Sequence, residues 1–197
     1  MFNFYVDKIT AADVKKIAAT LDRGGVILSP TDTIYGLGCR ADNSRAIRRI
    51  FEMKKRPVLK PLIVLVSSWA MLKKYYFFNS RQESAYKKIR EASPARPLSV
   101  ILKHRGLLPP LLSANGPTGA VRITADKLLL KIIRKIKMPL VSTSANLHNQ
   151  AQLSDPRDII KLLKPGPALA IIGGRPKNQP SRLIDLSDAE HIRILRS

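Results

Sequence analysis

The 197-residue chain has little of what exported, membrane-bound and metal-binding proteins use. It has one cysteine, Cys39, and therefore no internal disulfide, and its three histidines lie far apart in the sequence. No apolar run approaches the roughly 18 residues that would cross a bilayer, and residues 1–8 lack the basic-then-apolar order of a signal peptide. We therefore expect a cytoplasmic protein that is not exported and has no cysteine or histidine metal cluster.

Acidic residues are also scarce. The chain has 35 Lys and Arg residues against 14 Asp and Glu residues, a formal net charge of +21, and no Asp or Glu lies between Glu52 and Glu83. Such an excess attracts polyanions, whose binding weakens as salt rises. Double-stranded RNA or tRNA is thus an expected partner, although solubility explains the charge equally well, because net charge says nothing about chemistry.

Common catalytic and nucleotide-binding signatures are missing as well. Residues 36–41, Gly-Leu-Gly-Cys-Arg-Ala, fit the glycine pattern of a dinucleotide site, but the acidic residue required about 20 positions later is absent. No Gly-Lys-Ser or Gly-Lys-Thr occurs, which excludes the phosphate loop of nucleotide triphosphatases. Ser142, Thr143 and Ser144 lie outside a Gly-x-Ser-x-Gly elbow, so we interpret them as hydrogen-bonding groups rather than nucleophiles.

What the chain does contain is an alternation of strand-length apolar runs and helix-period segments. Strands are predicted at residues 26–29, 62–66, 98–103, 120–124, 139–144, 168–172, 181–186 and 192–195. Helices are predicted at residues 10–22, 43–57, 68–76, 80–92 and 126–137, and from Asp155 onward. This alternation predicts one α/β domain over residues 1–197, with helices packed on a single sheet whose strand order the sequence does not determine.

The most informative stretch begins with the apolar strand at residues 26–29 and continues through a turn of hydroxyls and glycines at residues 31–38. Small residues let backbone N–H groups approach a ligand, and the positive end of the following helix would favour an anion there. At the far end of that helix, Lys54 and Arg56 add two charges, and Lys60 follows. We predict a site for a phosphorylated ligand; alternatively, these cations only complement the helix C-terminus, worth about 0.3–1 kcal/mol each.

Five motifs, taken together and in order, resemble the YrdC family of threonylcarbamoyl-AMP synthases. They are residues 30–38, residues 54–57 with 60–62, residues 120–122, residues 142–146 and residues 180–181. Lys54-x-Arg56 with Ser144-x-Asn146 is similar to the four-residue signature that distinguishes the family's synthases from relatives without it. The chain departs from some members at Leu65, where they carry a histidine, and it resembles the short form without a further C-terminal domain.

The resemblance implies a curved mixed sheet with helices packed around a large basic cavity. It implies that L-threonine, bicarbonate and ATP with Mg²⁺ give threonylcarbamoyl-AMP and pyrophosphate. A partner threonylcarbamoyl transferase would then use this product to modify tRNA. The alternatives are a non-catalytic protein that binds double-stranded RNA or tRNA through the same basic cavity and through Lys131, Arg134 and Lys135, or a carbamoyl-transfer relative with another substrate.

The resemblance also implies roles for individual residues. The residues implied in catalysis are Lys54, Arg56, Ser144 and Asn146. Those implied in ATP binding are Arg56, Lys60, Thr118, Ser144 and Asn146. Those implied in threonine binding are Thr33, Arg122, Ser142 and Ser181, with Arg122 suited to the threonine carboxylate. The metal ligands stay unassigned, because ATP phosphates and water could hold Mg²⁺ with or without Asp32.

Overall fold

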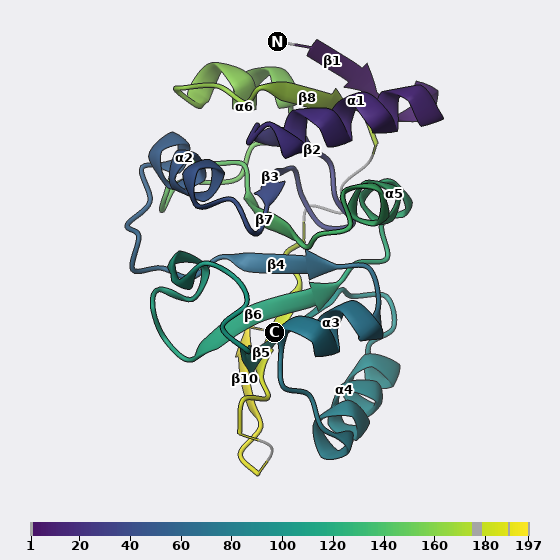
Figure 1. Ribbon diagram of the computed structural model, residues 1–197, viewed down its shortest axis with the longest axis vertical. Coiled ribbons are helices and arrows are strands. Elements are labelled where there is room, and N and C mark those ends of the chain that lie inside the picture. Colours follow the sequence, from purple (N-terminus) through teal and green to yellow (C-terminus); the bar gives the residue numbers. More distant parts are fainter. Residues whose placement is uncertain (1, 175–178, 189, 197) are drawn as a thin grey trace.

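The computed structural model describes residues 2–174, 179–188 and 190–196, in which ten strands form one mixed sheet (Figure 1). The strand order is β1-β8-β2-β3-β7-β4-β6-β5-β9-β10. The strands are β1 Phe2–Tyr5, β2 Ile27–Ser29, β3 Gly36–Arg40, β4 Ile63–Val66, β5 Leu98–Lys103, β6 Thr118–Ile123, β7 Leu140–Ser144, β8 Leu169–Ile172, β9 Arg182–Asp185 and β10 Arg193–Arg196. The sheet contains both parallel pairs, such as β4–β6, and antiparallel pairs, such as β3–β7.

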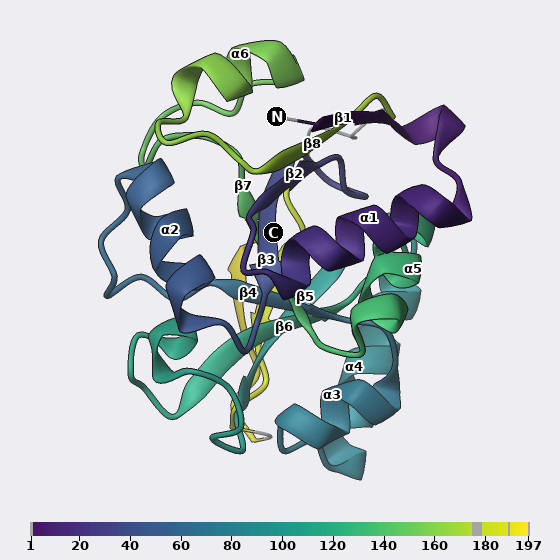
Figure 2. The ribbon, with the colours of Figure 1, turned by 45° about the horizontal axis from the view of Figure 1, so that its top comes forward.

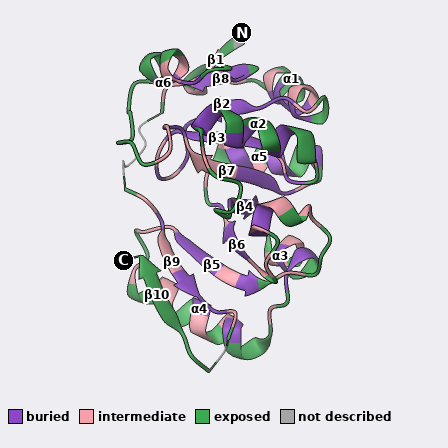
Figure 3. Cartoon of the chain, turned by 90° about the vertical axis from the view of Figure 1, so that its left-hand side faces the viewer, coloured by how far each residue is buried: buried purple, intermediate pink, exposed green. Residues whose placement is uncertain are grey.

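Helices cover both faces of this sheet (Figure 2). They are α1 Ala11–Asp22, α2 Ser44–Lys54, α3 Trp69–Tyr75, α4 Ser80–Ala92, α5 Lys127–Ile136 and α6 Pro156–Leu162, with short 3-10 helices at Val6–Lys8 and Pro110–Ser113. Successive side chains of β4 point to opposite faces, so Val64 packs with α2 and Leu65 packs with α1 and α5. The central strands are therefore buried on both sides (Figure 3), as their uninterrupted apolar sequences predict.

The helix boundaries follow from capping residues that the sequence displays. Thr10 accepts a hydrogen bond from the backbone of Asp13, whose carboxylate accepts from the backbone of Thr10 in return, and this capping box starts α1. Asn43 caps α2 through the backbone N–H of Ala46. At the other end of α2, Lys55 adopts the left-handed conformation that ends many helices. The predicted α/β class with a mixed sheet is confirmed.

One local prediction is wrong. Residues 36–38, expected to belong to the turn at residues 31–38, are the first part of β3, which pairs with β2 and β7. A Cβ atom on Gly36 would lie 3.3 Å from Ser142 Oγ, so the glycine permits close approach of a neighbouring strand. Strand β3 runs from Gly36, beside Ser144, to Arg40, beside Leu140. Helix α2 therefore starts near the Leu140 end of β7 and runs back toward its Ser144 end. The C-terminus of α2, not its positive N-terminus, therefore reaches Ser144.

The sequence patterns also missed β1, which pairs in parallel with β8 at the edge of the sheet. The other predicted strands and helices are present, with shifts of one to three residues at several boundaries. None of the described helices combines the length and apolar character needed to cross a membrane.

Candidate active site

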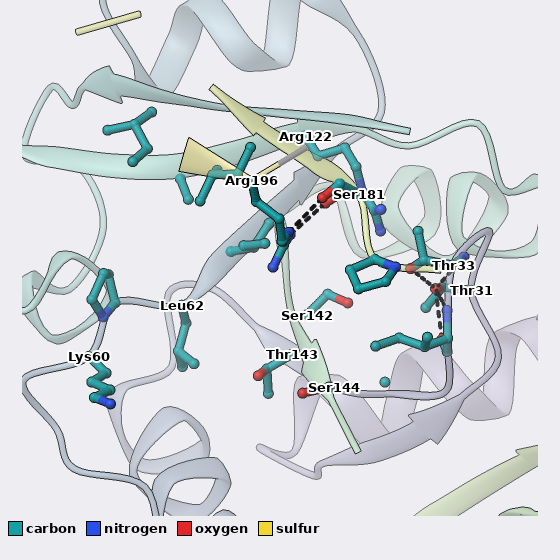
Figure 4. A pocket seen from close by; sticks show the side chains of 18 of the residues that line it. Thr31, Thr33, Lys60, Leu62, Arg122, Ser142, Thr143, Ser144, Ser181 and Arg196 are labelled. Atoms are coloured by element: carbon teal, nitrogen blue, oxygen red, sulfur yellow. Dashed lines mark hydrogen bonds between the residues drawn. The ribbon is translucent and has the colours of Figure 1, made fainter. Parts of the chain in front are cut away.

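A cavity of about 400 Å³ opens where β3, β4, β6 and β7 meet the chain that follows α2 (Figure 4). Four cationic side chains line it, from Arg56, Lys60, Arg122 and Arg196. Its hydroxyl groups come from Thr31, Thr33, Thr118, Ser142, Thr143, Ser144 and Ser181. No Asp or Glu is among the described residues that line it. Fixed cations and hydroxyl donors without carboxylates make this cavity suited to anions.

Arg56 and Lys60 form one end of the cavity. The Arg56 guanidinium donates from Nη2 to the carbonyl of Pro61 at 2.9 Å and makes a longer contact, 3.4 Å, from Nε to the carbonyl of Lys60. Burial lowers the pKa of Arg56. Figure 4 shows Lys60 at this end, well away from Thr33. These two cations can therefore meet a polyanion at one end while a smaller ligand occupies the other.

Arg122 supplies the cation of the other end. Only 5% of its side chain is exposed, and Nη2 lies 3.1 Å from Asp32 Oδ1 in an ion pair. Arg122 Nε and Asp32 Oδ1 nevertheless have no hydrogen-bond partner. Burial lowers the pKa of Arg122, while Asp32 and Asp126 oppose that shift. A buried guanidinium with an unused donor suits a carboxylate ligand, because such a ligand would supply the missing acceptor.

Hydroxyl groups surround this second end. Thr33 Oγ1 lies 2.8 Å from Thr31 Oγ1, which in turn donates to the carbonyl of Ile34. Ser181 Oγ lies 2.9 Å from the hydroxyl of Ser99. These bonds fix the hydroxyl positions in the absence of substrate. All four residues predicted to bind threonine, Thr33, Arg122, Ser142 and Ser181, therefore line one cavity.

The predicted catalytic quartet does not share one environment. Arg56 and Ser144 line the cavity, as do Lys60 and Thr118, but Lys54 and Asn146 do not. Lys54 is 1% exposed, and its Nζ is directed at Ser144 and Asn146. The physical reason is that the chain after β7 covers the end of α2: the N–H of His148 donates to the Lys54 carbonyl at 2.8 Å. Burial first, and then the charge of Arg56, lower the pKa of Lys54 to about 7.

Sequence reasoning missed Arg196. This residue lies in β10 and donates from Nε to the Ser181 carbonyl at 2.8 Å and from Nη2 to Ser181 Oγ at 3.1 Å, as Figure 4 shows. Burial, together with the charges of Arg122 and Arg96, lowers its pKa. It belongs to none of the five motifs, and only strand pairing brings it to the cavity. The sequence signal that could have pointed to Arg196 is the predicted strand at residues 192–195.

Two further predictions can be placed on the structure. Asp32 is paired with Arg122, and the described residues contain no group of three or more His, Cys, Asp or Glu side chains arranged for a metal. Lys131, Arg134 and Lys135 are exposed on α5 and do not line the cavity. The proposed RNA-binding face and the basic cavity are therefore separate surfaces, and RNA binding stays a prediction.

Curated relatives match most of the chain. A threonylcarbamoyl-AMP synthase of Psychromonas ingrahamii is 30% identical over 172 residues, which cover 86% of this chain and 90% of the relative. A threonylcarbamoyl-AMP synthase of Vibrio cholerae is 29% identical over 185 residues, which cover 93% of this chain and 96% of the relative.

Solved structures share the fold. Sua5 of P. abyssi in complex with L-threonine superposes with a TM-score of 0.83 at 26% identity over 95% of this chain, which spans 54% of that protein. E. coli YciO superposes with a TM-score of 0.85 at 25% identity, covering 100% of this chain and 94% of that one. The Sua5/YciO/YrdC family, described under the heading of telomere recombination, matches residues 19–197. The predicted family is confirmed: the chain belongs to the Sua5/YciO/YrdC family.

Proposed function

We propose that the chain is a threonylcarbamoyl-AMP synthase, which forms threonylcarbamoyl-AMP and pyrophosphate from L-threonine, bicarbonate and ATP. The observation that carries this proposal is the cavity whose described lining has four cations and no carboxylate. Relatives named for this activity share the family and most of the chain length. Because the cavity has two cationic ends, it can hold a polyphosphate and an amino acid at once.

The reaction explains why such a cavity is needed. The threonine amine attacks bicarbonate and loses water, which leaves a carbamate. A carbamate oxygen then forms a bond to the α-phosphorus of ATP, while the bond from that phosphorus to the β-phosphate bridging oxygen breaks and pyrophosphate leaves. Both reactants are anions, so they repel each other. Fixed cations lower this barrier by stabilising negative charge in the transition state and by holding the reactants in line.

The two ends divide the substrates between them. We propose that ATP binds at the end where Lys60 is exposed to solvent, which we call the open end, through Arg56, Lys60, Thr118 and Ser144. Thr33, Arg122, Ser142 and Ser181 are proposed to bind threonine, with its carboxylate on Arg122. Arg196 lies over Ser181 and adds charge between the two groups. The threonine amine would then face the α-phosphate in the middle of the cavity.

We propose that Mg²⁺ enters as part of the substrate, bound to the ATP phosphates. No carboxylate lines the described cavity, and the nearby Asp32 is held by Arg122. Mg²⁺ keeps several waters and is commonly held by phosphate oxygens with few protein ligands. We propose that the product passes to a transferase that modifies tRNA, and that both steps take place in the cytoplasm, where ATP and tRNA are found.

The proposal is tested by the release of pyrophosphate from MgATP in the presence of bicarbonate. We expect release that depends on L-threonine, together with transfer of label from bicarbonate into an adenylate. Release without threonine would indicate carbamoyl chemistry on another substrate. Absence of both signals would contradict the proposed function.

A further inference from the structure

The four-residue signature divides into two pairs with different surroundings. Arg56 and Ser144 line the cavity, whereas Lys54 and Asn146 lie behind its wall, 1% and 8% exposed. The hidden pair is joined directly, since Lys54 Nζ donates to Asn146 Oδ1 at 3.0 Å. Two residues of one sequence signature are therefore placed to contact a ligand, and the other two are placed to support the cavity wall.

The bonds of Lys54 leave it no donor for a substrate. Its ammonium has three N–H groups, and three oxygens accept from it: the Ser144 carbonyl, the Asn146 carbonyl at 2.7 Å and Asn146 Oδ1. Ser144 Oγ lies farther away, at 3.4 Å. A phosphate could reach Nζ only if one of the three shorter bonds broke.

Asn146 is also bonded within the protein. Its Oδ1 accepts from Lys54, and its Nδ2 donates to the Gln150 carbonyl at 2.6 Å. The turn around it is held by two further bonds, from the N–H of Ala145 to the Tyr35 carbonyl at 2.9 Å and from the N–H of His148 to the Lys54 carbonyl. The chain after β7 is thus attached to both α2 and the loop before β3.

We infer that Lys54 and Asn146 are a positioning pair, which fixes Ser144 on the cavity wall and touches no substrate. This inference rests on the proposed function only for the identity of the nucleotide. Lys54 holds the end of β7 in place by donating to the carbonyls of Ser144 and Asn146. The hydroxyl of Ser144 then stays on the cavity wall, where it can bind the ligand.

The test compares Lys54→Met, Asn146→Leu and the double variant with wild type. MgATP affinity is measured by calorimetry well below every melting temperature, and the melting temperatures are measured without ligand. We expect each single change to raise the Kd for MgATP about tenfold and to lower the melting temperature by several degrees. The double variant should lose little more than the worse single variant, because both changes disrupt one unit.

Lys55→Met is the matched control. Lys55 follows Lys54 directly and is exposed, and its replacement by Met removes the same charge. The Kd for MgATP and the melting temperature of this variant should therefore stay at wild-type values. Losses that add in the double variant would overturn the inference. A lowered melting temperature with wild-type affinity would overturn it as well, because the pair would then stabilise the fold without placing Ser144.

A structure of the wild-type protein with a non-hydrolysable ATP analogue gives a second, independent test. We expect Lys54 Nζ to keep its three oxygen partners and to make no hydrogen bond to a phosphate oxygen. A direct bond would overturn the inference. Absence of threonine-dependent pyrophosphate release would refute the proposed function alone, since the melting temperatures and the analogue structure need no turnover.

Discussion

The two ends of the cavity hold their cations in different ways. Arg122 is buried and keeps a carboxylate, Asp32, beside it. Among the described residues, no acidic side chain forms an ion pair with Arg56 or Lys60, and the partly exposed Arg56 donates to two carbonyl oxygens instead. A buried cation needs a compensating charge, whereas a cation near water can be left for the ligand. The buried end is thus suited to a small, exactly placed carboxylate, and the open end to a flexible polyphosphate.

The largest effect is expected for Arg122→Met. Loss of a charge-assisted contact to threonine should lower kcat/KM for threonine on the order of 100- to 1,000-fold. The change also leaves Asp32 without its cation, which should lower the free energy of unfolding by about 3 kcal/mol. Urea unfolding and pyrophosphate release measure the two losses. The double variant Arg122→Met/Asp32→Leu should regain stability but not activity, and recovered activity would show that Arg122 does not bind substrate.

A smaller loss is expected for Arg56→Met at the open end. Without the guanidinium, negative charge on the phosphates is less well compensated, so kcat/KM for ATP should fall about 50-fold. The melting temperature should hardly change, because Arg56 has no charged partner to leave behind. Steady-state kinetics with varied ATP and thermal melting check both statements. Equal destabilisation by Arg56→Met and Arg122→Met would remove the contrast between the ends.

A weaker effect is expected for Lys60→Met. Lys60 is exposed, so its attraction to phosphate acts largely through water and is screened by salt. The KM for ATP should rise about fivefold at low salt and approach the wild-type value at high salt. Kinetics at several salt concentrations test this. A loss that salt does not reduce would place Lys60 in a desolvated contact instead.

The smallest effect concerns pH. Burial and Arg56 lower the pKa of Lys54 to about 7 in the free protein, and a nearby triphosphate should raise it again. The complex then binds more protons than the free protein, so affinity for MgATP should decrease as the pH rises above 7. Titrations of wild type and Lys54→Met between pH 6 and 9 isolate this contribution from those of ATP and His148. Parallel curves would contradict it.

Much of the fold could be predicted, because local patterns decide it. The capping box of Thr10 and Asp13 starts α1 where expected, and the run that includes Val64 and Leu65 forms a strand covered on both faces. The turn assignment at residues 36–38 failed because glycine favours both turns and close strand contacts, and only the neighbouring β7 decides between them.

The sequence predicts most residues of the candidate site but not which of them are buried. Motif order gave Arg56, Arg122 and Ser144, and all three line the cavity. The burial of Lys54 depends on the chain after β7, which lies some 90 residues further on, and no local pattern encodes that cover. Arg196 reaches the site only through the pairing of β10 with β9. Contacts between distant segments therefore decide which of the motif cations are exposed to solvent.

The direction of α2 has a consequence for the electric field of the site. Because β3 reverses the chain, this helix presents its C-terminus to Ser144, and the aligned peptide dipoles place about half a negative charge there. That field repels phosphate. The charge of Lys54, in the last turn of the helix, opposes this field, so Arg56 and Lys60 are not needed to offset it. Lys54 thus serves the helix, and the two cations after α2 serve the ligand.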